Sequence, residues 1–398
     1  MKTIKNKKRL GLIGTVLLGI CVAVGLGGIR LPDKICLMES STIPQYISVG
    51  IRLMEPETKP AFSQASPLCN TKRMTASFLG ILPLKEISVK TITEKKVMPG
   101  GMLFGVKLTT KAPLILELCP DGEEGCPAAK AGLRSGDLIL AVGQTKITDT
   151  AALQEAINAS GGKEIEITFE RDGIENKTVL IPQKNADDAQ YHAGILVRDS
   201  SAGIGTVTFI EPDSGSFAGL GHGICDADTG MLLPIGSAQT RIVSLQGVQR
   251  GAVGAPGELR GTFTQKRSGA LLRNTDCGVF GVFGKEIKCE DSALVPIGLK
   301  ADIHTGKATI LASVTPEKSR AEYEIEITKI IGGDDNKSFI VHVTDPALLE
   351  TTGGIVQGMS GSPVLQNGKL VGAITHVMVN DPTKGYGVFL ENMLAKAS

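Results

Sequence analysis

Short hydrophobic stretches alternate with polar ones along most of this chain, and the one long apolar run lies near the N-terminus. Residues 10–29 contain no charged side chain, and five basic residues precede them: Lys2, Lys5, Lys7, Lys8 and Arg9. As a helix this run would span ~30 Å, the hydrocarbon thickness of a bilayer. We therefore expect residues 1–34 to form a basic cytoplasmic tail and a transmembrane signal anchor, with the rest exported. A cleaved signal peptide is the alternative.

The next segment, residues 35–97, is mixed in character. Strand-like patterns at 46–53 and 86–92 flank a polar stretch rich in Pro, Ser and Thr. We expect a juxtamembrane spacer with some β structure.

Residues 98–185 follow the pattern of a small α+β module. An apolar strand is predicted at 114–118 and a helix at 150–159, with Asp149 in the position of an N-cap. Two further strands, 165–171 and 177–181, flank an Asp172-Gly173 turn.

The blocks PAAKAGL and GDLIL, within residues 127–140, resemble the PDZ domains of bacterial envelope proteases. Such domains add a peptide strand to a sheet edge and hold its terminal carboxylate in a loop. The resemblance implies that Leu103, Phe104 and Gly105 form this loop and that the helix at 150–159 forms the opposite wall. A module that only packs against its neighbours is the alternative.

The remaining residues, 190–398, are rich in short strand patterns separated by glycine-rich turns. Apolar stretches recur at 240–246, 279–283, 308–314, 323–330 and 339–343. Many short strands of this kind predict a β-barrel or two paired barrels. The chain as a whole is expected to be mainly β.

The segment Gly358-Met359-Ser360-Gly361-Ser362-Pro363 indicates the chemistry of this last domain. Glycines beside a serine allow a tight turn whose N–H groups can point at a carbonyl oxygen, as in chymotrypsin-like peptidases. This resemblance implies a C-terminal chymotrypsin-like double β-barrel domain. We expect Ser360 to be the nucleophile and the N–H groups of Gly358 and Ser360 to form the oxyanion hole. Ser362 is a rival nucleophile. The dipeptide Asn367-Gly368 predicts a hairpin directly afterwards.

A serine nucleophile needs a base, and His222 is the candidate because glycines flank it on both sides. The other four histidines are less well placed: His192, His304, His342 and His376. His342 and His376 alternate with Val or Ile, which is typical of structural histidines in strands.

A carboxylate should orient the histidine. Asp345, which follows a strand pattern and precedes a proline, is the first candidate. Asp226 and Asp228 remain rivals because they lie close to His222 in sequence.

Composition excludes some classes of function. The net charge is +1, and no basic stripe interleaves with aromatic residues, so a nucleic-acid partner is not expected. The eight cysteines form no C-x-x-C pair, and we expect neither a metal nor a cofactor. Two cysteine pairs could close short loops, Cys119 with Cys126 and Cys277 with Cys289, or these thiols could stay reduced.

Taken together, these motifs resemble the SpoIVB peptidase family of endospore-forming bacteria. The resemblance rests on the N-terminus, the PDZ pattern, the segment 197–205, the Gly-Leu-Gly-His-Gly-Ile segment at 219–224 and the Gly-rich segment ending at Pro363. It implies that His222, Asp345 and Ser360 are the catalytic residues.

The resemblance also implies a function for the whole chain. Members are serine endopeptidases exported across the forespore inner membrane, where they cleave themselves near the N-terminus and are released. They cleave a membrane-bound regulator of the intramembrane protease that activates a mother-cell sigma factor. In this chain, residues 40–54 are the expected self-cleavage region. The alternative is a non-catalytic PDZ adaptor that binds the C-termini of envelope proteins.

Overall fold

The computed structural model describes residues 34–38, 51–54, 69–78, 81–92, 95–119, 126–284, 293–317, 320–333 and 335–397. They fall into two compact units, one within residues 1–95 and one spanning residues 96–397. The predicted membrane span at 10–29 lies outside the described residues. Within the described ranges, no helix has the length and apolar character needed to cross a bilayer.

The first unit is a four-stranded sheet in the order β1-β4-β3-β2. Its strands are β1 (Lys34–Met38), β2 (Ile51–Met54), β3 (Cys69–Phe78) and β4 (Leu82–Ile92). Ala76, Ile87 and Val89 form its small buried core. The predicted strand at 86–92 lies within β4. Most of the expected self-cleavage region, 40–50, lies outside the described residues, and 51–54 form β2.

A closed six-stranded barrel forms the C-terminal part of the second unit, with strand order β19-β20-β21-β24-β23-β22. The strands are β19 (Gly306–Ala312), β20 (Ala321–Ile330), β21 (Phe339–Val343), β22 (Pro363–Gln366), β23 (Lys369–Val377) and β24 (Lys384–Phe389). Three short helices accompany it: η1 (Lys300–Asp302), α5 (Pro346–Thr352) and α6 (Leu390–Ala397). Inward residues of neighbouring strands, such as Ile310, Ile327 and Val341, are fully buried in its core.

A second barrel precedes it in the sequence. A long sheet follows the order β6-β15-β16-β17-β14-β13, and an additional pairing of β6 with β13 closes these six strands on themselves. Their bounds are β6 (Leu103–Leu118), β13 (Ile195–Ile210), β14 (Ser216–Gly219), β15 (Ser237–Gln249), β16 (Glu258–Thr275) and β17 (Gly278–Phe283). Beyond β13, the sheet continues through β5 (Lys96–Pro99) and β18 (Val295–Pro296). The expected pair of barrels is therefore present.

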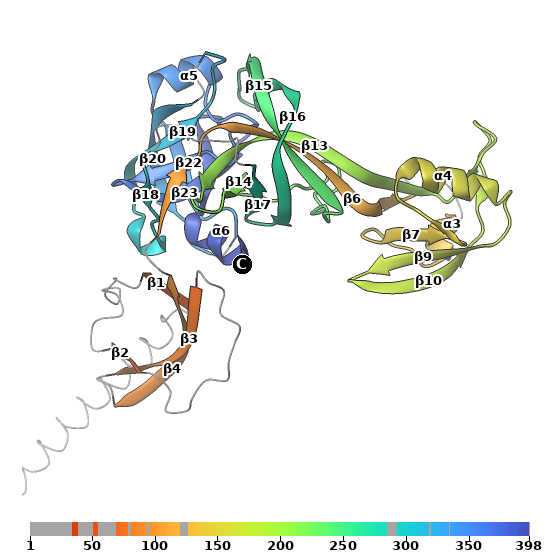
Figure 1. Ribbon diagram of the computed structural model, residues 1–398, viewed down its shortest axis with the longest axis horizontal. Helices are drawn as coiled ribbons and strands as arrows, with labels where there is room; N and C mark the ends of the chain where they lie inside the picture. The colour runs from red at the N-terminus through yellow and green to blue at the C-terminus, as the bar shows by residue number, and fades with distance from the viewer. Residues whose placement is uncertain are drawn as a thin grey trace, which may run out of the picture. The chain divides into compact units, whose positions relative to one another are not determined.

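Strands β6 and β13 do not stop at the barrel. They run side by side out of it, and their far ends form part of a small α+β module (Figure 1). There the sheet order is β10-β9-β7-β6, with β8 on β7. The remaining elements are α3 (Pro127–Lys130), β7 (Leu138–Val142), β8 (Thr145–Lys146), α4 (Thr150–Ala159), β9 (Ile165–Arg171), β10 (Ile174–Leu180), β11 (Gln183–Lys184) and β12 (Tyr191–His192).

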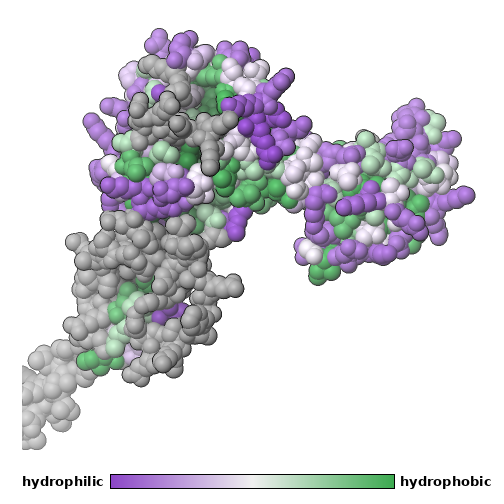
Figure 2. Space-filling model, in the orientation of Figure 1, coloured by the Kyte–Doolittle hydropathy of each residue, from purple (hydrophilic) through white to green (hydrophobic). Residues whose placement is uncertain are grey.

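The helix and the turn that the sequence predicts in this module are both present. The helix α4 spans the expected residues, and the Asp149 carboxylate caps it by accepting a hydrogen bond from the Ala152 N–H at 2.8 Å. Leu153 and Ile157, one turn apart, point into the core. The turn at Asp172-Gly173 has positive φ at both residues, 52° and 80°, as the hairpin requires. On the face shown in Figure 2, hydrophilic residues cover much of the module's surface.

The structure differs from the prediction for the PDZ carboxylate loop. Leu103, Phe104 and Gly105 begin β6 inside the first barrel, where Phe104 pairs in register with Ile242 of β15 and Gly205 of β13. The Phe104 side chain is 2% exposed and packs edge-on against Phe217. The prediction was wrong because a glycine-rich apolar stretch is compatible with a barrel strand as well as with a carboxylate loop.

Candidate active site

Residues of both barrels line a cleft of about 580 Å³. The first barrel contributes 201–205 from β13 and Leu220 and 222–225 from the loop after β14, and the second contributes 355–358, Ser360 and 375–377. No Asp, Glu, Lys or Arg is among the described residues that line it. The cleft is therefore an uncharged hollow with a small set of polar groups.

Ser360 lies on a tight loop that precedes β22. Gly358 and Gly361, on either side of it, both have φ of 97°, a conformation that residues with a side chain rarely adopt. Within the described part of the chain, the N–H groups of Gly358 and Ser360 donate to no other group, whereas the next two, of Gly361 and Ser362, bond to Ile374 and Met359. Two unused donors beside a serine hydroxyl are the arrangement that an oxyanion hole requires.

The structure separates the two serines of this loop. Ser360 is half-buried and lines the cleft, and its hydroxyl donates to the Thr375 carbonyl at 2.6 Å. Ser362 is 0% exposed, and its hydroxyl has no hydrogen-bond partner among the described residues. A fully buried hydroxyl cannot meet a substrate, so the geometry favours Ser360.

His222 lies in the same cleft, on the loop that follows β14. Its Nδ1 is 2.8 Å from the Gly223 carbonyl oxygen. Because a carbonyl only accepts, Nδ1 carries the proton and Nε2 has the lone pair that a general base needs. Burial lowers the pKa of His222 below its ordinary value of 6.5. The imidazole is therefore neutral at physiological pH.

Sequence reasoning missed a second histidine in the cleft. The expectation that His376 belongs to a strand is met by β23, but its ring lies 4.8 Å from that of His222, centroid to centroid. Burial, and then the charges of His222 and Lys337, lower the pKa of His376 to about 4. No local signal marks this residue, since alternation with apolar residues is equally typical of a structural histidine. Of the remaining three, His192 pairs with Asp188, His304 contacts the Asp302 carbonyl and His342 pairs in register with Glu326 and Lys384.

Within the described residues, no hydrogen bond joins Asp345, the predicted third catalytic residue, to His222. Asp345 is the N-cap of α5, and its carboxylate accepts hydrogen bonds from the N–H groups of Ala347 and Leu348, at 2.9 and 3.1 Å, and of Glu324 at 3.2 Å. Within the described residues, the group bonded to Nδ1 of His222 is the Gly223 carbonyl. An aspartate directly before a proline is typical of a helix N-cap as well as of a catalytic position, and Asp345 is an N-cap in this structure.

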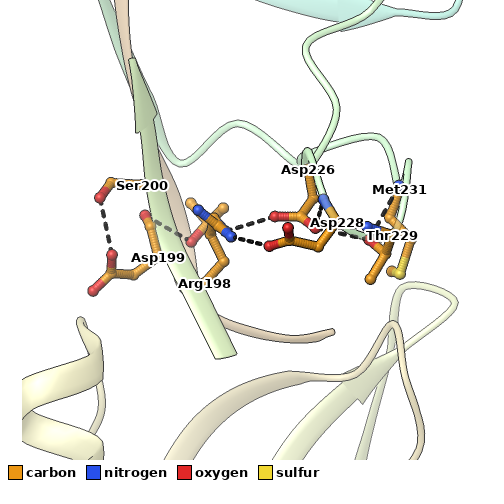
Figure 3. A network of polar contacts seen from close by, with 8 residues as sticks. Arg198, Asp199, Ser200, Asp226, Asp228, Thr229 and Met231 are labelled. Atoms are coloured by element: carbon orange, nitrogen blue, oxygen red, sulfur yellow. Dashed lines mark hydrogen bonds and ion pairs between the residues drawn. The ribbon is translucent and has the colours of Figure 1, made fainter. Parts of the chain in front are cut away.

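The two rivals for this role, Asp226 and Asp228, point elsewhere. Figure 3 shows both facing Arg198 of β13, whose guanidinium lies 2.6 Å from Asp226 and 2.8 Å from Asp228. Asp226 is 3% exposed; burial alone would raise its pKa, but hydrogen bonds from Thr229 and Asp228 and the charge of Arg198 lower it. Its carboxylate fastens the loop that carries His222 to β13.

A second hollow, of about 220 Å³, lies in the α+β module. Its walls are α4 on one side and residues 192–197 on the other. Over 195–198, β13 pairs with β6 along one edge, and no described strand pairs with the other. Cys119, which forms a disulfide with Cys126, is among the lining residues, and its N–H donates to the Gly194 carbonyl at 2.9 Å. Cys277 is buried, and Cys289 lies outside the described residues.

One cleft holds a glycine-flanked serine from one barrel and a histidine from the other, and an α+β module lies beside it. These features define a serine peptidase with a PDZ domain. The PDZ family matches residues 120–171, and the SpoIVB peptidase S55 family matches residues 189–394, more than half of the chain. The chain therefore belongs to the SpoIVB peptidase S55 family.

Curated relatives match over shorter stretches. Two are proteins of Lactococcus lactis: one provisionally named a zinc metalloprotease is 38% identical over 19% of this chain, and the serine protease Do-like HtrA is 35% identical over 17%. The matched stretch spans 17% of the length of each of these relatives. Among solved structures, the active form of the Rv3671c protease of M. tuberculosis is 13% identical, over 49% of this chain and 72% of that one, with a TM-score of 0.28.

Proposed function

We propose that this chain is a serine endopeptidase in which Ser360 is the nucleophile and His222 is the general base. The observation that carries the proposal is the Ser360 loop, which places an accessible hydroxyl and two unused N–H donors in the cleft that His222 also lines. Membership of the SpoIVB peptidase S55 family supports the same reaction.

The chemistry is acyl transfer. The Ser360 hydroxyl turns from the Thr375 carbonyl toward Nε2 of His222, gives up its proton there and attacks a peptide carbonyl. The N–H groups of Gly358 and Ser360 stabilise the oxyanion, a contribution for which one donor is typically worth ~2.7–4 kcal/mol. The Gly223 carbonyl replaces a carboxylate in orienting the imidazole. His222 then protonates the leaving amine, and water releases the acyl group.

The lining of the cleft supports a substrate class. Its pocket-forming residues beside the Ser360 loop, Ile355, Val356 and Val377, are apolar, and no charged side chain among the described lining residues is available to pair with a charged substrate. The expected substrates are peptides with an uncharged, apolar side chain next to the scissile bond.

The biological role follows from the family resemblance. The chain acts in this proposal as a sporulation signal at the forespore inner membrane, anchored by residues 10–29. It cleaves itself near the N-terminus and then cleaves a membrane-bound regulator of an intramembrane protease. The PDZ hollow binds an extended peptide, by strand addition along the free edge of β13 at 195–197.

Two measurements on the full-length chain test the proposal. Wild type and Ser360→Ala are expressed side by side, and intact mass and N-terminal sequencing follow. The proposal expects wild type to lose its N-terminus and the variant to stay whole. A fluorophosphonate probe should label Ser360 in wild type, and an unlabelled, folded wild type would contradict the proposal.

The alternative is a PDZ adaptor without catalysis. One observation favours it: the Ser360 hydroxyl donates to Thr375 rather than to His222. The same fluorophosphonate experiment separates the two functions, because an adaptor would take no label while still binding peptide in the PDZ hollow.

A further inference from the structure

Thr206, in the C-terminal half of β13, contacts both loops of the candidate active site although it is itself 0% exposed. Its N–H donates to the Ser360 carbonyl at 2.9 Å, and its hydroxyl donates to the Gly358 carbonyl at 2.7 Å. Its own carbonyl accepts the Leu220 N–H at 3.2 Å, two residues before His222. One residue therefore bonds to the serine loop of one barrel and the histidine loop of the other.

The two bonds to the serine loop have a consequence for the oxyanion hole. The Ser360 N–H belongs to the peptide unit between Met359 and Ser360. Thr206 holds the carbonyls of the peptide units directly before and after it, those of Gly358 and Ser360. Because a peptide unit is planar, fixing both neighbours leaves the unit between them little freedom to rotate. The orientation of the Ser360 N–H is thereby restricted.

Contact between the loop and β13 is direct. A Cβ at Gly361 would lie 2.0 Å from the Thr206 carbonyl oxygen and 2.5 Å from the Leu220 nitrogen. The serine loop therefore rests on the backbone of Thr206 and Leu220 with no side chain between them. The spacing between the serine and histidine loops is set at this point.

We propose that Thr206 is a positioning residue, which holds the oxyanion donors and sets the serine loop against the loop of His222. This inference rests on the proposed peptidase function. It predicts that loss of the hydroxyl alone impairs the chemical step more than substrate binding, because the donors act mainly on the transition state.

The chain offers a matched control. Thr208 lies two residues along β13, is also 0% exposed, and its hydroxyl donates to the Gly361 carbonyl at 2.8 Å, beyond the oxyanion hole. Thr206→Val and Thr208→Val each remove one buried hydroxyl of the same kind at nearly constant volume. Thr206→Ser restores the donor.

The experiment uses the full-length chain and measures the rate of fluorophosphonate labelling and the kcat and KM for an apolar peptide. Thr206→Val is expected to lower the labelling rate and kcat at least tenfold, with KM changed less than threefold. Thr206→Ser and Thr208→Val should stay within threefold of wild type. Thermal melting shows whether each variant is folded; should Thr206→Val fail to fold, Thr206→Cys, a weak donor of similar volume, should show the same loss relative to Thr206→Ser.

Three results would overturn the inference while leaving the proposed function intact: undiminished labelling of a folded Thr206→Val, an equal loss in Thr208→Val, or no rescue by serine. A wild-type chain that takes no label would overturn the proposed function and this inference together.

Discussion

The PDZ hollow and the candidate active-site cleft lie along the same strand, β13, and are built in different ways. Residues 195–197 line the first and residues 201–205 line the second. Nearly all other walls of the PDZ hollow come from one helix, α4, and the segment directly before β13. The cleft instead gathers segments around residues 220, 256, 358 and 376, which lie far apart in sequence.

This difference explains which parts of the chain local patterns can reveal. The cap and the apolar face of a helix depend on about ten neighbouring residues, so α4 can be predicted from the sequence. The cleft depends on two barrels closing and meeting, so its composition depends on long-range register. Between the two hollows, Asp199 accepts a hydrogen bond from the Thr150 N–H at the start of α4, and Arg198 holds the loop of His222 through Asp226.

The largest effect is expected in the cleft. Ser360→Ala should lower peptidase activity by roughly 10⁴–10⁶-fold, because removing a serine nucleophile leaves only binding and oxyanion stabilisation. The melting temperature and the PDZ hollow should be unchanged. Ser362→Ala is the control for the same loop, and steady-state hydrolysis of a peptide measures both. An inactive Ser362→Ala beside an active Ser360→Ala would reverse the assignment.

The pH dependence should also distinguish the cleft. A histidine base works only when neutral, and burial lowers the pKa of His222, so activity should be retained below pH 6.5 and fall only at more acidic pH. The measurement is a profile of kcat/KM against pH. Peptide binding to the PDZ hollow does not involve His222, and a binding assay at each pH provides the comparison. An acid limb centred above pH 6.5 would show that this base is not a buried His222.

A smaller effect is expected at Asp345. Asp345→Ala removes the N-cap of α5 and should lower the free energy of unfolding by about 0.5–2 kcal/mol, as measured by chemical denaturation. Activity should stay within a few-fold of wild type, because the Gly223 carbonyl orients His222. If Asp345 instead oriented the histidine, Asp345→Asn would reduce kcat by about 10⁴-fold.

The smallest effect on the cleft should come from the disulfide of the PDZ module. Replacing Cys119 and Cys126 together by serine removes a short loop closure worth about 2.5 kcal/mol in the chain-entropy account. Hydrogen exchange at 194–197 should accelerate, because Cys119 bonds to Gly194. Fluorophosphonate labelling of Ser360 should change less than twofold. A large change there would show that the two hollows are coupled along β13.

Particular residues show how far sequence reasoning reached. The turns at Asp172-Gly173 and Asn367-Gly368 and the capped helix α4 formed as predicted, since each depends on neighbouring residues. Ser360 and His222 were found through their flanking glycines, and both line the cleft. Leu103, Phe104 and Gly105 were misplaced because β6 continues from the barrel into the PDZ module, so its two ends serve two domains.

The sequence by itself determined the strand-rich composition, the α+β module, the hairpins and the glycine-flanked serine and histidine, because backbone preferences act over a few residues. Only the tertiary structure decided that Gly223 rather than Asp345 contacts His222, that His376 faces the cleft and that Ser362 is buried. It also decided that Thr206 bonds to the loop of Ser360 and to the loop that carries His222. These contacts join residues up to about 150 positions apart, and they exist only once β13 and the two barrels have closed.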